Sequence, residues 1–149
     1  MEEYSRIKHL DYVTAAIERM AANSFKCKSW AIALTCAVLA LNKIETNILT
    51  PVIAIFALVS LWWLDAYYLR LERLFCELYN TVRLGDLSIS PYDMNIKPYM
   101  DKVDSEFQIM FTKSELPVYV PTLAISLLYA IPVILPEILA VINCIFIKK

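Results

Sequence analysis

The chain has 149 residues, of which 59% are hydrophobic, 19% are charged and one is glycine, and its net charge is −1. This length allows one domain, and the apolar residues gather in runs, which is typical of a membrane protein. The near-neutral charge supplies no general basic field, so we expect no nucleic-acid groove.

The first predicted element is an amphipathic helix on the cytoplasmic side, over residues 1–28. Its apolar side chains recur at steps of three and four, which places them on one helical face: Ile7, Leu10, Val13, Ile17 and Met20. This face either packs on another helix of the same chain or lies on the bilayer surface.

Residues 29–64 predict an antiparallel transmembrane hairpin. Ser29–Leu41 and Ile48–Leu64 are apolar, and the short polar segment Asn42–Asn47 joins them. The 17 residues of the second run span about 25 Å as a helix, just enough for the hydrocarbon layer. Small residues, which let helices approach closely, share one face of the first run: Ala33, Ala37 and Ala40.

A cytoplasmic helix and loop region is predicted over residues 65–116. Aromatic residues at the end of the second span and one turn beyond it are typical of a membrane–water interface: Trp62, Trp63, Tyr67 and Tyr68. The helical pattern then continues to Gly85, a helix stop, so the second helix extends out of the membrane and can pack on the first. The remainder contains Pro91 and Pro98 and is expected to be mostly irregular, with a short helix within Val103–Phe111.

A third, proline-kinked transmembrane segment is predicted over residues 117–147. The apolar stretch extends about 45 Å as a helix, which exceeds one bilayer, and Pro132 and Pro136 favour a kink. A re-entrant pair of half-helices broken between these prolines is the alternative. The predicted fold class is therefore an all-α membrane protein, with an antiparallel transmembrane hairpin extended into the cytoplasm and a kinked third span.

Lysine and arginine predict the orientation. They are concentrated on the two flanks of the hairpin and nearly absent from the loop between its spans: Arg19, Lys26 and Lys28 before it, Arg70, Arg73 and Arg83 after it, and Lys43 within the loop. The positive-inside rule places the N-terminus and the middle region in the cytoplasm. A single third span puts Lys148 and Lys149 outside, against the rule, which favours the re-entrant alternative.

Asp65, at the cytoplasmic edge of the second span, is predicted to form an interfacial ion pair. Lipid offers a carboxylate no partner, and Lys26 and Lys28 are expected at the same depth on the first span. The pair either fixes the register of the hairpin or belongs to a gating ring in an oligomer.

A mildly polar stripe on the third span supplies pore-lining candidates: Thr122, Ser126, Tyr129 and Glu137. Such a stripe either holds helices together or lines water. Glu137 is either solvated near the outer interface or turned to a pore or another subunit. Because three helices of one copy cannot enclose a channel, a pore requires a homo-oligomer.

Residues that carry enzyme chemistry are sparse. No Walker A, G-x-S-x-G, H-E-x-x-H or dinucleotide-binding pattern occurs. The four cysteines have no C-x-x-C spacing, and His9 is the one histidine. We therefore expect no catalytic site, no metal and no cofactor, and an ordinary packed or surface role for His9.

Three sequence motifs are spread over most of the chain. The first is E-R-M-A-A-N-S-F at residues 18–25, followed by Lys28 and Trp30. The second is W-L-D-A-Y-Y-L at 63–69, followed by E-R-L-F and L-Y. The third is P-Y-M-D-K-V-D-S at 98–105, followed by F-T-K at 111–113. Together they resemble a group of small bacterial three-span membrane proteins, from which the proline-rich end departs.

This group is similar to the transmembrane effectors of antiphage nucleotide-signalling systems such as Hailong, in which a nucleotidyltransferase makes a signal that controls a membrane-disrupting partner. The resemblance implies a homo-oligomeric, pore-forming effector in the bacterial inner membrane, controlled by a nucleotide ligand or a protein partner. A non-conducting scaffold that anchors a cytoplasmic enzyme is the alternative. The polar stripe favours the pore, whereas the lack of a charged pore ring favours the scaffold.

Overall fold

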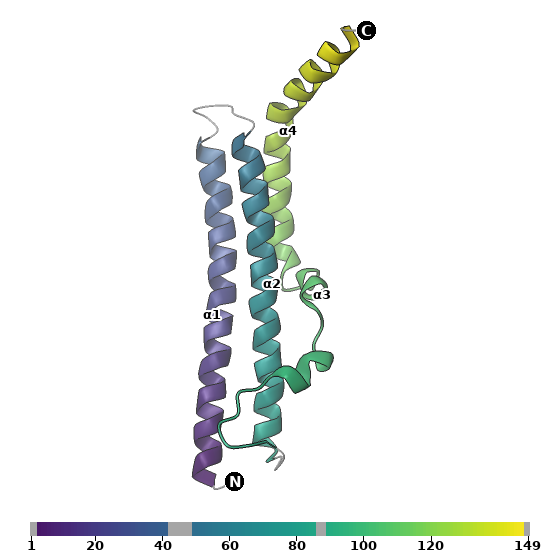
Figure 1. Ribbon diagram of the computed structural model, residues 1–149. Helices are drawn as coiled ribbons and strands as arrows, with labels where there is room; N and C mark the ends of the chain where they lie inside the picture. Colours follow the sequence, from purple (N-terminus) through teal and green to yellow (C-terminus); the bar gives the residue numbers. More distant parts are fainter. Residues whose placement is uncertain (1–2, 42–48, 86–88, 148–149) are drawn as a thin grey trace.

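The computed structural model describes residues 3–41, 49–85 and 89–147, and all regular structure within these ranges is helical. The predicted all-α class is confirmed. The predicted loop Asn42–Asn47 lies outside the described residues. Figure 1 shows three long helices side by side and two short ones on the connection before the last: α1 (Glu3–Leu41), α2 (Leu49–Arg83), η1 (Lys97–Lys102), α3 (Glu106–Met110) and α4 (Leu116–Ile147).

Two of the long helices are long and apolar enough to cross a membrane, namely α2 and the part of α4 from Leu116 to Pro136. The predicted amphipathic helix and first span form one continuous helix, α1, because neither proline nor glycine interrupts them. The apolar part of α1 has 13 residues, from Ser29 to Leu41, and extends only about 20 Å.

The polar half of the bundle is built as predicted, by packing of the α1 stripe on the extension of α2. Val13 contributes to a buried cluster with Leu74, Leu78 and Val82. The α2 extension ends at Arg83, and Gly85 adopts a φ of 77°, the left-handed conformation of a helix terminus. Ile7 departs from the prediction, since it is exposed.

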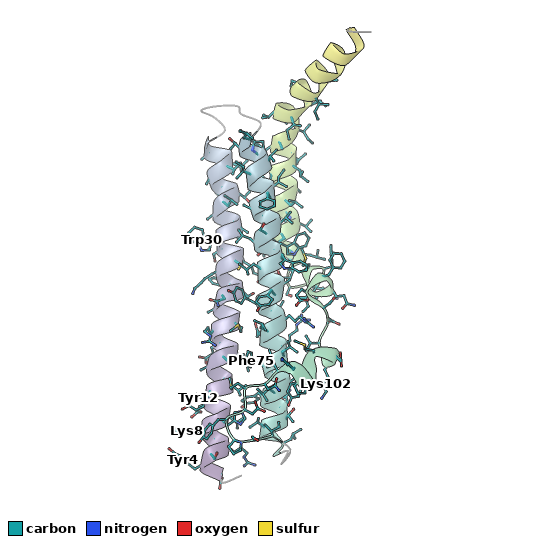
Figure 2. The ribbon with its side chains drawn as sticks, viewed as in Figure 1. Tyr4, Lys8, Tyr12, Trp30, Phe75 and Lys102 are labelled. Carbon is teal, nitrogen blue, oxygen red and sulfur yellow. The ribbon has the colours of Figure 1, made fainter. Side chains whose placement is uncertain are left out.

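His9 also belongs to this half and is fully buried. Its Nε2 lies 2.8 Å from the carbonyl oxygen of Asp93, on the connection that follows α2. Tyr4, Lys8 and Tyr12 project from α1 away from α2 (Figure 2), and the Tyr12 ring lies 5.9 Å from that of Tyr92 on the same connection. Of the two roles expected for His9, packed or surface, it therefore has the packed one.

The apolar half of the bundle joins all three long helices. Its core contains Ala31 of α1, Ala66 of α2 and Tyr119 of α4, with α3 packed against it. Ala31 and Ala66 are fully buried, and their small side chains let α1 and α2 approach closely. The predicted small-residue face points elsewhere, because Ala33, Ala37 and Ala40 are exposed.

The last helix, α4, is continuous through Pro132 and Pro136. The break that a re-entrant pair of half-helices requires is therefore absent from the described backbone. In Figure 1 the final turns of α4 lean away from α1 and α2.

Candidate functional site

One lysine and two carboxylates meet where the three long helices converge. Lys28 Nζ of α1 lies 2.7 Å from Asp65 Oδ2 of α2 and 2.9 Å from Oε1 of Glu115, the residue before α4. Both carboxylate side chains are 0% exposed, and that of Lys28 is 20% exposed. We call these three residues the Lys28 cluster; it ties together three segments far apart in the sequence.

Two neutral side chains complete the polar surroundings of the cluster. Lys28 Nζ also donates to Ser24 Oγ at 3.0 Å, and the Tyr119 hydroxyl donates to Asp65 Oδ2 at 2.9 Å. The outer oxygens, Asp65 Oδ1 and Glu115 Oε2, are buried without a hydrogen-bond partner among the described residues. Each carboxylate is therefore stabilised on one side only, and its desolvation is incompletely offset.

The charges in the cluster do not balance. With all three groups ionised, two negative charges face one positive charge. Burial raises the pKa of Glu115 to about 7, with the charge of Asp65 acting in the same direction and the hydrogen bond from Lys28 opposing it. For Lys28, burial lowers the pKa, but the hydrogen bonds to Asp65 and Glu115 outweigh it, so the net pKa is raised. The cluster therefore gains or loses a proton at Glu115 near neutral pH.

Local sequence brings the third member into place. The Glu115 backbone N–H donates to the Thr112 carbonyl at 3.1 Å, in a turn where the hydroxyls of Thr112 and Ser114 lie 3.0 Å apart. α4 begins one residue later with Pro117 in its first turn, where proline is tolerated because that N–H has no helical acceptor. The turn presents Glu115 to Lys28.

Of the two lysines predicted to pair with Asp65, one joins the cluster and the other does not. Lys28 binds Asp65 directly, whereas Lys26 is exposed and forms no ion pair within the described ranges. The sequence did not predict a role for Glu115, because this residue was assigned to the polar segment before the third span. Its position immediately before an apolar run was the available signal, since that places an acid at the same expected depth as Asp65.

Two of the four predicted pore-lining residues, Thr122 and Ser126, lie on the inner side of α4. Thr122 and Ser126 are buried, and each hydroxyl donates to a backbone carbonyl of its own helix, at 2.9 Å to Val118 and 2.8 Å to Thr122. Tyr129 is half-buried. Glu137 lies in the α4 backbone, but its side chain is outside the described set. Thr122 and Ser126 therefore face the other helices rather than an outer surface.

The predicted aromatic belt is divided between two roles. Trp63 and Tyr67 are exposed, as interfacial residues are. Trp62 instead points inward: its ring stacks on that of Tyr119, with centroids 5.6 Å apart and planes at 8°, and its Nε1 donates to the Met110 carbonyl at 3.1 Å. Trp62 therefore supports the Lys28 cluster from the apolar side.

Comparison of the chain with family models, with curated proteins and with solved structures finds no match. The resemblance to antiphage effectors therefore rests on the sequence motifs alone. Chemically, the cluster offers charge pairing and proton exchange at the point where α1, α2 and α4 are held together.

Proposed function

We propose that the chain is a bacterial inner-membrane protein whose three long helices cross the bilayer, with the amino-terminal half of α1 and residues 65–116 in the cytoplasm. The length and composition of α2 and α4 support this placement. So do the exposed side chains of their apolar halves, which are hydrophobic and suited to lipid: Ile53, Phe56, Val59, Ile125, Leu128 and Ile131.

The apolar part of α1 is the third span in this proposal. It is short for a bilayer, but Trp30, which is 67% exposed, projects outward near its start (Figure 2), as aromatic residues do at membrane interfaces. Local thinning of the bilayer accommodates a short span at modest free-energy cost. α4 contains Pro132 and Pro136 within its 32 residues, and we propose that a kink at these prolines shortens the depth that the helix covers.

We further propose that the protein is a homo-oligomeric effector that makes the membrane leak ions in antiphage defence. The observation that carries this proposal is the Lys28 cluster. It holds α4 against the α1–α2 hairpin through two buried carboxylates with unsatisfied oxygens, a contact whose loss separates the helices. In the closed state the stripe of Thr122 and Ser126 is packed inside one copy, and release of α4 exposes it to a shared axis.

In this proposal, the cytoplasmic part of the protein controls the release of α4. A nucleotide, such as a nucleotidyltransferase-derived signal, or a protein partner binds the polar half of the bundle and changes the position of α1 relative to α2. This part of the proposal follows from the family resemblance. The continuity of α1 and α2 from the polar core to the Lys28 cluster gives such a signal a direct structural route.

Overproduction without the regulator tests the effector proposal. We expect collapse of the membrane potential, read with a voltage-sensitive dye, and growth arrest. Ser126→Leu adds an apolar side chain to the stripe and should relieve toxicity at unchanged expression. Leu127→Ile, on the exposed side of α4, is the matched control and should stay toxic.

The non-conducting scaffold is the second candidate, favoured by the burial of Thr122 and Ser126 within one copy. It predicts that purified protein in liposomes retains a trapped ion-sensitive dye, even with the activating ligand supplied. It also predicts that a partner enzyme leaves the membrane fraction when the protein is deleted. A leak that Ser126→Leu abolishes rejects the scaffold.

A further inference from the structure

We propose that α3 and the turn after it lie in the membrane–water interface, with Phe107 and Phe111 inserted between lipid headgroups. This inference rests on the proposed membrane placement of α2 and α4. It moves α3 and the turn after it from the cytoplasm, where the proposed function places residues 65–116, to the interface. Phe107 is 63% exposed and Phe111 52% exposed. Their rings form an edge-to-face pair with centroids 5.2 Å apart.

Contacts with α2 fix the depth of α3. At its start, Glu106 Oε1 accepts from Arg70 Nη1 at 2.7 Å. At its end, the Met110 carbonyl accepts from Trp62 Nε1 at 3.1 Å, and the Phe111 ring lies 5.6 Å from that of Trp62. Arg70 and Trp62 are about 12 Å apart along a helix axis. From its start to its end, α3 therefore runs along α2 from charged side chains toward the apolar half of α2.

The end of α3 lies on the apolar side of the Lys28 cluster. Trp62 is one helical turn closer to the amino terminus of α2 than Asp65, and that is the direction of the apolar half. Beside it on α2, Trp63 is 49% exposed and Val59 44% exposed. The two phenylalanines therefore continue a surface that the membrane placement assigns to lipid, which is why a bilayer is favoured over a protein partner.

The charges of the segment also suit a lipid surface. Between residues 106 and 114 the ionisable side chains are Glu106 and Lys113. Glu106 is paired with Arg70, and its pKa is lowered by its own backbone N–H and by that guanidinium, so it stays ionised and neutralised. Lys113 is exposed. The free charge of the segment is positive, which complements anionic headgroups.

The segment is rigid enough to hold the two rings in place. Ser105 and Gln108 form a capping box at the start of α3, in which each side chain bonds to the backbone of the other residue. Ile109 and Met110 are buried in the core of the apolar half. The inward side chains thus dock α3 on the bundle while the aromatic pair points outward.

Spin-label accessibility tests the proposal. Single cysteines at Phe107 and Phe111, in a chain whose native cysteines are replaced, are labelled with a nitroxide and reconstituted in vesicles of phosphatidylethanolamine and phosphatidylglycerol. Collisions with oxygen, which concentrates in lipid, and with a water-soluble nickel chelate are compared. We expect both labels to lose most of their nickel accessibility relative to a control label at Tyr4, which is 68% exposed at the far end of α1.

A label at Phe56, 75% exposed in the middle of the apolar half of α2, separates this inference from the proposed function. Nickel access at Phe107 and Phe111 with oxygen access at Phe56 overturns the interfacial placement and leaves the membrane proposal standing. Nickel access at all three sites overturns both. Labels at Phe107 and Phe111 that are immobile, closed to both reagents and broadened by spin–spin coupling place a second copy on this surface and also overturn the inference.

Discussion

At the scale of residues, the Lys28 cluster combines charges that a folded protein rarely buries without compensation. The Lys28 ammonium bonds to both Asp65 and Glu115, and these two carboxylates have no other cation within 4 Å in the described part of the chain. Removal of either acid leaves a balanced pair, whereas removal of the lysine leaves two buried negative charges. The lysine should therefore be far less tolerant of substitution than either acid.

Lys28→Met should destabilise the protein by about 3 kcal/mol or more, because it leaves uncompensated buried charge. The measurement is the unfolding midpoint in detergent, followed by circular dichroism as a harsher detergent is titrated in. Lys26→Met is the control and should change stability by less than about 0.5 kcal/mol, since Lys26 is exposed. Equal effects of the two substitutions would contradict the cluster as described.

The raised pKa of Glu115 predicts a pH dependence with a definite sign. The folded state holds this proton up to about pH 7, whereas the unfolded state releases it near the ordinary value of 4.5. The folded state binds more protons in that window, so this group makes stability fall as pH rises from 4.5 to about 7 and level off above it.

Glu115→Gln isolates this effect, because the amide mimics the protonated acid. The charged neighbours that face Glu115, Lys28 and Asp65, remain in the variant. We expect the stability difference between variant and wild type to increase, in favour of the variant, as the pH is raised from about 5 to about 8. A difference that is constant across this range would show that Glu115 titrates as an ordinary surface acid.

At the scale of elements, periodicity predicted the faces that α1 and α2 turn to each other in the polar half. The burial of Val13, Leu74 and Leu78 was predicted correctly, because apolar residues at steps of three and four define a single apolar face of the helix. Periodicity failed where the whole circumference of a helix is apolar. The inward turn of Trp62 and the outward turn of Ala37 depend on which neighbour each face meets, and hydropathy does not carry that information.

Glu115 was missed for a related physical reason. Its role depends on the turn before α4 and on the depth at which that turn packs against α2. Both depend on tertiary contacts, such as the bond between Trp62 and the Met110 carbonyl. The pairing of Asp65 with Lys28 was predicted because the two helices of a short hairpin must lie side by side. Glu115 lies more than 80 residues from Lys28 in sequence, and no short connection fixes its position relative to that lysine.

The exposed small-residue face of α1 predicts a contact between copies. Exposed alanines at helical spacing let a second helix approach closely in lipid. Ala37→Leu should weaken association, measured as a loss of the oligomer in cross-linking and in light scattering of the detergent-solubilised protein. Ile32→Leu, at another exposed position of the same helix, should leave the oligomer intact. An oligomer that tolerates Ala37→Leu must form through a different face.

At the scale of the whole molecule, the positive-inside distribution predicts that the connection between α1 and α2 faces the periplasm. A single cysteine at Glu45, in a chain without other cysteines, should react in intact cells with a membrane-impermeant maleimide. A cysteine at Lys8, in the polar half, should react only after the cells are opened. Protection at Glu45 together with reaction at Lys8 would invert the topology.

The uninterrupted course of α2 has a mechanical consequence. From Val52 to Arg83 this helix contains neither glycine nor proline, so it has none of the usual sites at which helices bend. A force applied at Leu78 or Val82 therefore displaces Asp65 as part of the same rigid rod. Rotation of that rod by a fraction of a turn carries the Asp65 carboxylate away from the ammonium of Lys28. Because ion pairing depends steeply on distance at a poorly solvated site, a small angular displacement at one end becomes an abrupt change in electrostatic energy near the middle of the molecule.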